Sequence, residues 1–116
     1  AISHFINPRN MGILSDVDGY MKLTGPCGDT MKIWLKVTND DISDISFMTN
    51  GCCNAIACCS AATDLAKGRS IFEAQFINQG DVLIAINGLT EEDKHCALLA
   101  SKTLKEAIGD YLTWKA

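Results

Sequence analysis

Three features are absent from this 116-residue sequence: a long apolar run, an excess of basic residues and a targeting segment. A transmembrane helix needs about 20 consecutive apolar residues, and no stretch approaches that length, so no membrane-spanning segment is expected. Ten basic residues face fourteen acidic ones, for a net charge of −4, which argues against nucleic-acid or anionic-membrane partners. Neither a secretory core nor an Arg- and Ser-rich transit segment is found, which favours a cytoplasmic location.

Internal repeats and low-complexity segments are also absent. The length and the 47% hydrophobic content predict that residues 1–116 form a single domain with its own core. Six cysteines are present, but Cys52 and Cys53 are adjacent, as are Cys58 and Cys59. That spacing, together with the missing secretion signal, favours reduced thiols in a cytosol-like compartment over disulfides.

The first half of the chain has the pattern of a small sheet. Residues 1–16 predict an incomplete helix followed by a turn, broken at Asn7-Pro8. Residues 20–24, 30–37 and 42–49 predict three strands, and the middle one alternates clearly between apolar and polar residues. In the third strand, Ile45 and Phe47 are expected to point inward. Because only short turns separate the strands, an antiparallel meander is expected.

The second half has a helical pattern. We expect a helix over residues 55–67 that closes at Gly68, and a second helix that opens at Ser70 and stops near Gly80. Asp81 is expected to cap a short third helix, and Thr90 to open the longest one. The fold class is therefore α+β, with a small three-stranded antiparallel sheet and helices packed on one face. The buried stripe of the last helix is predicted to comprise Leu98, Leu99, Leu104, Ile108, Tyr111 and Leu112.

The stretch Gly25-Pro26-Cys27-Gly28-Asp29-Thr30 places a thiol and a carboxylate in a tight loop before the clearest strand. In a meander, this loop and the end of the third strand lie at one edge, so Cys27, Asp29 and Cys52 are expected to meet. Cys52 also precedes a helix N-terminus, whose partial positive charge favours the thiolate. Cys96, after His95 in the last helix, completes the set if that helix begins at the same edge.

Three thiolates with Asp29 or His95 as a weaker fourth ligand suit two kinds of site. One is zinc, and the other is an iron–sulfur cluster, which four cysteines usually hold. A carboxylate or imidazole in place of the fourth thiolate makes a cluster easier to release. Taken locally, the same Gly-Pro turn is equally compatible with a buried structural thiol, and Cys58 and Cys59 are better explained as core packing.

The chain resembles the IscU/NifU-type iron–sulfur cluster assembly scaffolds along nearly its whole length. Each shared stretch is weak alone, and the set in this order is specific. The stretches are His4-Phe5, Asn7-Pro8-Arg9-Asn10, Gly12, Asp18-Gly19, Gly25-Pro26-Cys27-Gly28-Asp29, Gly51-Cys52, Ala55-Ile56-Ala57, Lys67-Gly68, Glu73-Ala74, His95-Cys96, Ala107-Ile108 and Asp110-Tyr111.

This resemblance implies a function and a site. The cluster-binding cysteines of the family correspond to Cys27, Cys52 and Cys96, its auxiliary aspartate to Asp29, and its histidine to His95. A cysteine desulfurase would deliver sulfur as a persulfide, and a [2Fe–2S] cluster would form and pass to apo iron–sulfur proteins. A ferredoxin and a frataxin-like protein are the usual helpers, and in a eukaryote the location would be the mitochondrial matrix.

The sequence departs from the family at two places. Leu89-Thr90-Glu91-Glu92-Asp93-Lys94 replaces a Leu-Pro-Pro-Val-Lys chaperone-docking segment, which argues against an Hsp70-type chaperone partner; its acidic run is interpreted as favourable charge at a helix start. Cys53, Cys58 and Cys59 replace residues that are usually glycine and serine.

Three functions therefore compete. The leading one is a non-enzymatic scaffold for [2Fe–2S] assembly and transfer. The alternatives are a zinc-bound sulfur acceptor for a desulfurase and a structural zinc domain. The long insertion typical of zinc-dependent acceptors between the second and third site cysteines is missing here, which favours the scaffold.

Overall fold

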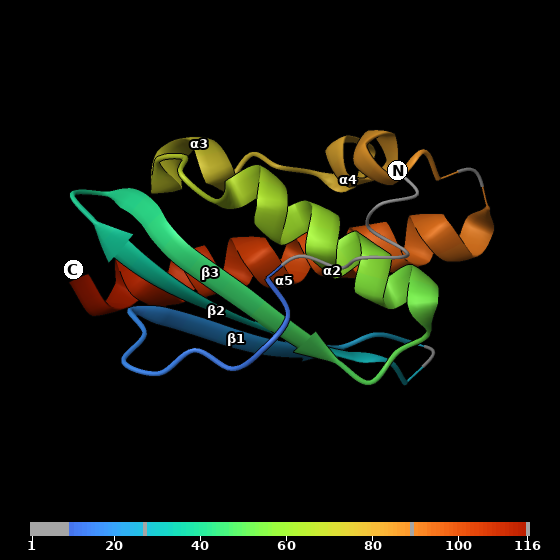
Figure 1. Ribbon diagram of the computed structural model, residues 1–116, viewed down its shortest axis with the longest axis horizontal. Coiled ribbons are helices and arrows are strands. Elements are labelled where there is room, and N and C mark those ends of the chain that lie inside the picture. The colour runs from blue at the N-terminus through green and yellow to red at the C-terminus, as the bar shows by residue number, and fades with distance from the viewer. Residues whose placement is uncertain (1–9, 27, 89, 116) are drawn as a thin grey trace.

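A three-stranded antiparallel sheet forms the first layer of the fold (Figure 1). The computed structural model describes residues 10–26, 28–88 and 90–115. Strands β1 (Gly19–Thr24), β2 (Thr30–Thr38) and β3 (Asp41–Thr49) follow one another in space as they do in sequence. The predicted meander and its strand boundaries are confirmed to within one residue. Of the helix and turn predicted over residues 1–16, residues 1–9 lie outside the described part, and residues 10–16 are not helical.

Alternation along the strands decides which face of the sheet is buried. Met31, Ile33 and Leu35 of β2 are fully buried, as are Ile45 and Phe47 of β3, because residues two apart point to the same side. A register shift between Lys36 and Val37 marks a bulge near the β2–β3 turn.

Four described helices follow the sheet: α2 (Cys53–Ala66), α3 (Ile71–Ala74), α4 (Gln79–Ile86) and α5 (Glu91–Lys115). Helix α2 contacts β3 and α5, and α5 also contacts β1 and β2, so these two helices cover the buried face of the sheet. Helix α4 packs on α2 and α5 and forms an outer layer (Figure 1). The α+β class with helices on one face is confirmed. Among the described residues no helix is long and apolar enough to span a membrane.

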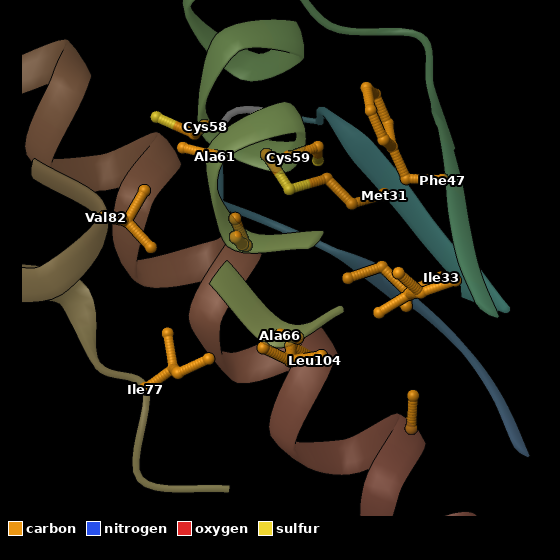
Figure 2. Close-up of a cluster of buried hydrophobic side chains, with 14 of the residues drawn as sticks. Met31, Ile33, Phe47, Cys58, Cys59, Ala61, Ala66, Ile77, Val82 and Leu104 are labelled. Carbon is orange, nitrogen blue, oxygen red and sulfur yellow. The ribbon is translucent and has the colours of Figure 1, made fainter. Parts of the chain in front are cut away.

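Small residues on α2 and α5 allow the two helices to approach closely. The buried positions of α2 are mostly alanine and cysteine, and Ala97, Ala100 and Ala107 line the inner side of α5. Figure 2 shows Cys59 on the side of α2 that faces Met31 and Phe47, and Cys58 on the other side of the helix. Both thiols are fully buried.

Three predictions about the helices were wrong. The helix predicted from Ser70 to near Gly80 ends at Ala74 after one turn, as α3, because Asn78 caps the start of the next helix, α4. Asn78, and not Asp81, caps α4; Asp81 lies at the third helical position and closes a reciprocal capping box with Asn78. Leu98 is 53% exposed, since the buried stripe of α5 runs through its alanines and Leu104.

Candidate metal centre

The loop between β1 and β2 is closed by its own backbone. The Gly25 amide donates to the Asp29 carbonyl at 2.8 Å, and the Gly28 amide donates to the Gly25 carbonyl at 3.0 Å. Gly28 has a φ of +89°, a left-handed conformation that glycine adopts without steric penalty. The closure places Asp29 at the sheet edge, directly before β2.

The end of β3 is fastened to the same edge. The Thr49 hydroxyl donates to the Thr30 carbonyl at 2.7 Å, and the Thr30 amide donates to the Asn50 side-chain oxygen at 2.8 Å. Gly51 then lies against Asp29: a Cβ at this position would be 3.2 Å from the Asp29 carboxylate and 2.5 Å from the Cβ of Ala55. The chain leading into α2 is thereby held beside Asp29.

Cys52 occupies the N-cap of α2 with an extended backbone, and its side chain does not cap the helix. The thiol is exposed and available to the site. The unpaired amides of the first turn and the helix dipole provide partial positive charge around it.

The first turn of α5 brings the last thiol to this edge. The Thr90 hydroxyl accepts from the Asp93 amide at 3.0 Å, and the Asp93 carboxylate accepts from the Thr90 amide at 3.2 Å. Asn54 donates to the same carboxylate from α2. Cys96, three residues further along α5, is buried with 6% exposure.

These elements bring Asp29, Cys52 and Cys96 together. One potential ligand atom from each lies within 4.8 Å of the other two. Thiolates that share a tetrahedral ion through 2.3 Å bonds lie about 3.8 Å apart, so a modest contraction allows the three groups to bind one ion. Two sulfurs and a carboxylate oxygen suit zinc or iron.

Two of these donors, Asp29 and Cys96, line a hollow of about 430 Å³. Its walls are largely apolar, with Leu23, Pro26, Leu98 and Leu99 among the lining residues. Glu92 and His95 also line it, and both are exposed. The Cys52 thiol donates to the Glu92 carboxylate at 3.1 Å.

Burial and negative surroundings both act on Cys96. Desolvation, followed by the charges of Cys52, Asp29, Glu92 and Asp93, raises the pKa of Cys96 to about 12. Cys96 therefore holds its proton at neutral pH, and a cation that binds must displace it.

The family described as NifU-like N terminal domain matches residues 1–116. This chain belongs to that family.

Two relatives with curated names and one solved structure are similar to this chain. The chain is 47% identical over 109 residues to an Archaeoglobus fulgidus protein named iron-sulfur cluster assembly scaffold protein IscU 1, covering 93% of this chain and 71% of the relative. It is 40% identical over 115 residues to the Escherichia coli scaffold protein IscU, covering 95% and 89%. A NifU-like N-terminal domain from Brucella abortus shares the fold with a TM-score of 0.74, at 17% identity and coverage of 98% and 92%.

The structure brings together three of the site residues that the family resemblance implied. Asp29, Cys52 and Cys96 lie together, whereas Cys27 lies outside the described residues. His95 borders the hollow but does not belong to the close group of donors, so its role as a ligand stays a prediction.

Sequence reasoning missed Glu92 and Asn54. Glu92 was interpreted only as favourable charge at a helix start, although its position four residues before Cys96 places both side chains on one face of α5. That spacing was the available signal. Nothing in the sequence indicated that Asn54 pairs with Asp93.

Proposed function

We propose that this protein is a scaffold on which [2Fe–2S] clusters are assembled from iron and persulfide-derived sulfur, and from which they pass to apo iron–sulfur proteins. The observation that carries the proposal is the convergence of Asp29, Cys52 and Cys96 from three separate elements, with ligand atoms within 4.8 Å of one another. Relatives that are 40–47% identical are named cluster assembly scaffolds, which supports the same assignment.

The donor set suits a cluster that must be released. We propose Cys27, Cys52 and Cys96 as the thiolate ligands and Asp29 as the fourth, with His95 as an alternative to Asp29. A carboxylate binds iron less tightly than a thiolate, so an acceptor protein offering four cysteines draws the cluster away. The hollow beside the donors gives such an acceptor access.

Sulfur delivery requires a nucleophilic thiolate and a partner. In the proposed step, a site thiolate attacks the terminal sulfur of the persulfide of a cysteine desulfurase. A new S–S bond forms on the scaffold, and the desulfurase cysteine leaves as a thiolate. Reducing the transferred sulfur to sulfide takes two electrons, which a ferredoxin would supply, and a frataxin-like protein would assist iron entry. Of the two proposed site thiols that the structure describes, Cys52 is better placed to attack, because it is exposed and Cys96 is buried.

A zinc-bound sulfur acceptor is the second candidate. It is favoured by one observation: Asp29, Cys52 and Cys96 are close enough to bind a single ion, and the same donor types hold zinc in proteins. In this role one Zn²⁺ would occupy the site while a thiolate accepts the persulfide sulfur.

Anaerobic reconstitution separates the two functions. The apo chain is incubated with ferrous iron, cysteine, a desulfurase and dithiothreitol, which supplies the two electrons per sulfur, and visible absorption and iron and sulfide content are measured. A parallel sample is titrated with Zn²⁺. We expect sulfide-to-iron charge-transfer bands, two irons and two sulfides per chain or per dimer, and transfer to an apo-ferredoxin. Stoichiometric zinc binding with no such bands would support the acceptor instead.

The proposed scaffold role also has consequences for catalysis, location and chaperone partners. We propose a carrier without turnover of its own, working in the cytoplasm as one domain over residues 1–116. An Hsp70-type chaperone is not expected as a partner, because residues 90–93 form a helix start with Thr90 and Asp93 in a capping arrangement.

A further inference from the structure

Glu92 points its carboxylate at the proposed cluster site. Its Oε1 atom lies 3.1 Å from Cys52 Sγ, and Glu92 precedes Cys96 by four residues on the same helix face. The side chain comes from α5 and meets a thiol at the start of α2, 40 positions away in sequence. Glu92 also lines the hollow together with Asp29 and Cys96.

The neighbouring acids on α5 have other tasks. Glu91 forms an ion pair with Lys94 at 3.1 Å, and its side chain is 80% exposed. Asp93 completes the capping arrangement with Thr90 and accepts from Asn54. Glu92, in contrast, accepts a hydrogen bond from the Cys52 thiol. The three acids in the first turn of α5 therefore differ in role: Glu91 faces solvent, Asp93 caps the helix, and Glu92 contacts the site.

The separation of Glu92 and Cys52 suits a shared ion. Bonds of 2.3 Å to sulfur and about 2.1 Å to oxygen at a tetrahedral angle place the two ligand atoms about 3.6 Å apart. The observed 3.1 Å opens to that value through a small rotation of an exposed side chain. Carboxylate oxygens are favourable ligands of ferrous iron, and zinc also accepts them.

We propose that Glu92 is a second carboxylate ligand at this site and binds a divalent metal ion, ferrous iron in function, together with Cys52 before sulfide arrives. The inference rests on the proposed function for the identity of the ion, and on the geometry alone for the ligand. Asp29 and Glu92 both line the hollow, so an entering cation meets two carboxylates in addition to the thiols.

Cobalt titration of the anaerobic apo chain tests this role. Co²⁺ reports the thiolate number through its sulfur charge-transfer intensity and the geometry through its d–d bands. Glu92→Gln keeps the size of the side chain and removes the charge, and Glu91→Gln is the matched control one position away. We expect Glu92→Gln to weaken Co²⁺ and Fe²⁺ affinity about tenfold or more and to alter the d–d bands, with unchanged charge-transfer intensity. Glu91→Gln should match the wild-type protein in both measurements.

Two results would overturn the inference: a Glu92→Gln variant that matches Glu91→Gln in affinity and spectrum, or one that loses affinity while its d–d bands stay unchanged. The second result would mean that Glu92 acts only through its charge. Urea unfolding of the apo variants excludes a folding defect. Reconstitution of the wild-type chain is scored separately, so failure to build a cluster tests the proposed function and leaves the cobalt result intact.

Discussion

Asn54 donates a hydrogen bond to Asp93 across 2.5 Å and joins the first turn of α2 to the first turn of α5. Cys52 lies two residues before Asn54, and Cys96 three residues after Asp93. The bond therefore sets the spacing between the two helix starts that carry the described thiols of the site. Asp93 is buried at 6% exposure, so its interactions form in surroundings of low polarity.

We expect Asn54→Ala to destabilise the apo protein by about 1–3 kcal/mol, because a buried carboxylate loses one of its donors. Zn²⁺ affinity should also fall, since the two thiols become less well aligned. Urea unfolding and competition with a metal chelator measure the two effects. Ser43→Ala, which removes two exposed hydrogen bonds at the far turn of the sheet, is the control. Unchanged stability and metal affinity in Asn54→Ala would show that the bond does not align the helices.

Gly51 is a second point where the site depends on backbone packing. A methyl group there would approach the Ala55 Cβ to 2.5 Å and the Asp29 carboxylate to 3.2 Å. We expect Gly51→Ala to lower both stability and metal affinity, because α2 and Asp29 must move apart. Gly109→Ala is the matched control: its Cβ meets nothing within 4 Å, and the helix should gain about 1 kcal/mol. Equal stability changes in the two variants, measured by urea unfolding, would contradict this account.

The sheet could be predicted from sequence because its signals are local. Strict alternation in β2 and short polar turns fix both the strands and their antiparallel order. The helical half was predicted less well. The apolar residues between Ser70 and Gly80 fit a continuous helix, but the capping pair at Asn78 and Asp81 starts a new one. Leu98 was placed in the core because leucine is usually buried there, whereas this helix packs through alanine.

Part of the site was likewise predictable. The meander topology placed Asp29 and Cys52 at one edge, and the structure brings them together. The position of Cys96 could not be derived from spacing, since it depends on the tertiary contact between Asn54 and Asp93. The residues alone made Cys96 a candidate only on the condition that the last helix begins at the same edge, and the resemblance to a known family supported it. A search for side chains four positions from Cys96 on α5 would have supplied Glu92.

Cys58 and Cys59 are expected to stabilise the core and to be dispensable for cluster assembly. Both are fully buried, and the Cys58 thiol donates weakly to the Asp93 carbonyl at 3.8 Å. Cys58→Ala and Cys59→Ala should each lower stability by about 1 kcal/mol and leave reconstituted iron and sulfide content unchanged. Cys53→Ala, at an exposed position, should affect neither measurement. Loss of the cluster in the Cys58 or Cys59 variant would make that thiol a ligand.

The free energy of unfolding should fall at alkaline pH because the Cys59 thiol is buried. Burial first, and then the charges of Cys58 and Cys96, raises the pKa of Cys59 well above 9.0. The folded state then keeps its proton where the unfolded state loses it, so stability is retained below pH 9 and falls above it. The loss for this thiol grows as the pH rises further above 9. Urea unfolding from pH 8 to 10.5 should give a shallower decline for Cys59→Ala than for wild type, and parallel curves would contradict the prediction.

Asp29 is expected to control the release of the cluster. Its carboxylate belongs to the close group of donors and packs against Gly51, so its position is fixed by the sheet edge. Asp29→Ala should still assemble a cluster on the thiols but transfer it to an apo-ferredoxin at least several-fold more slowly. The reason is that the weakest ligand, which the acceptor thiol displaces first, has been removed. Transfer is followed by circular dichroism of the holo-ferredoxin. Asp44→Ala is the control, because Asp44 is a carboxylate of β3 that pairs with Lys67 and does not belong to the donor group. Unchanged transfer kinetics in Asp29→Ala would show that release does not begin at this carboxylate.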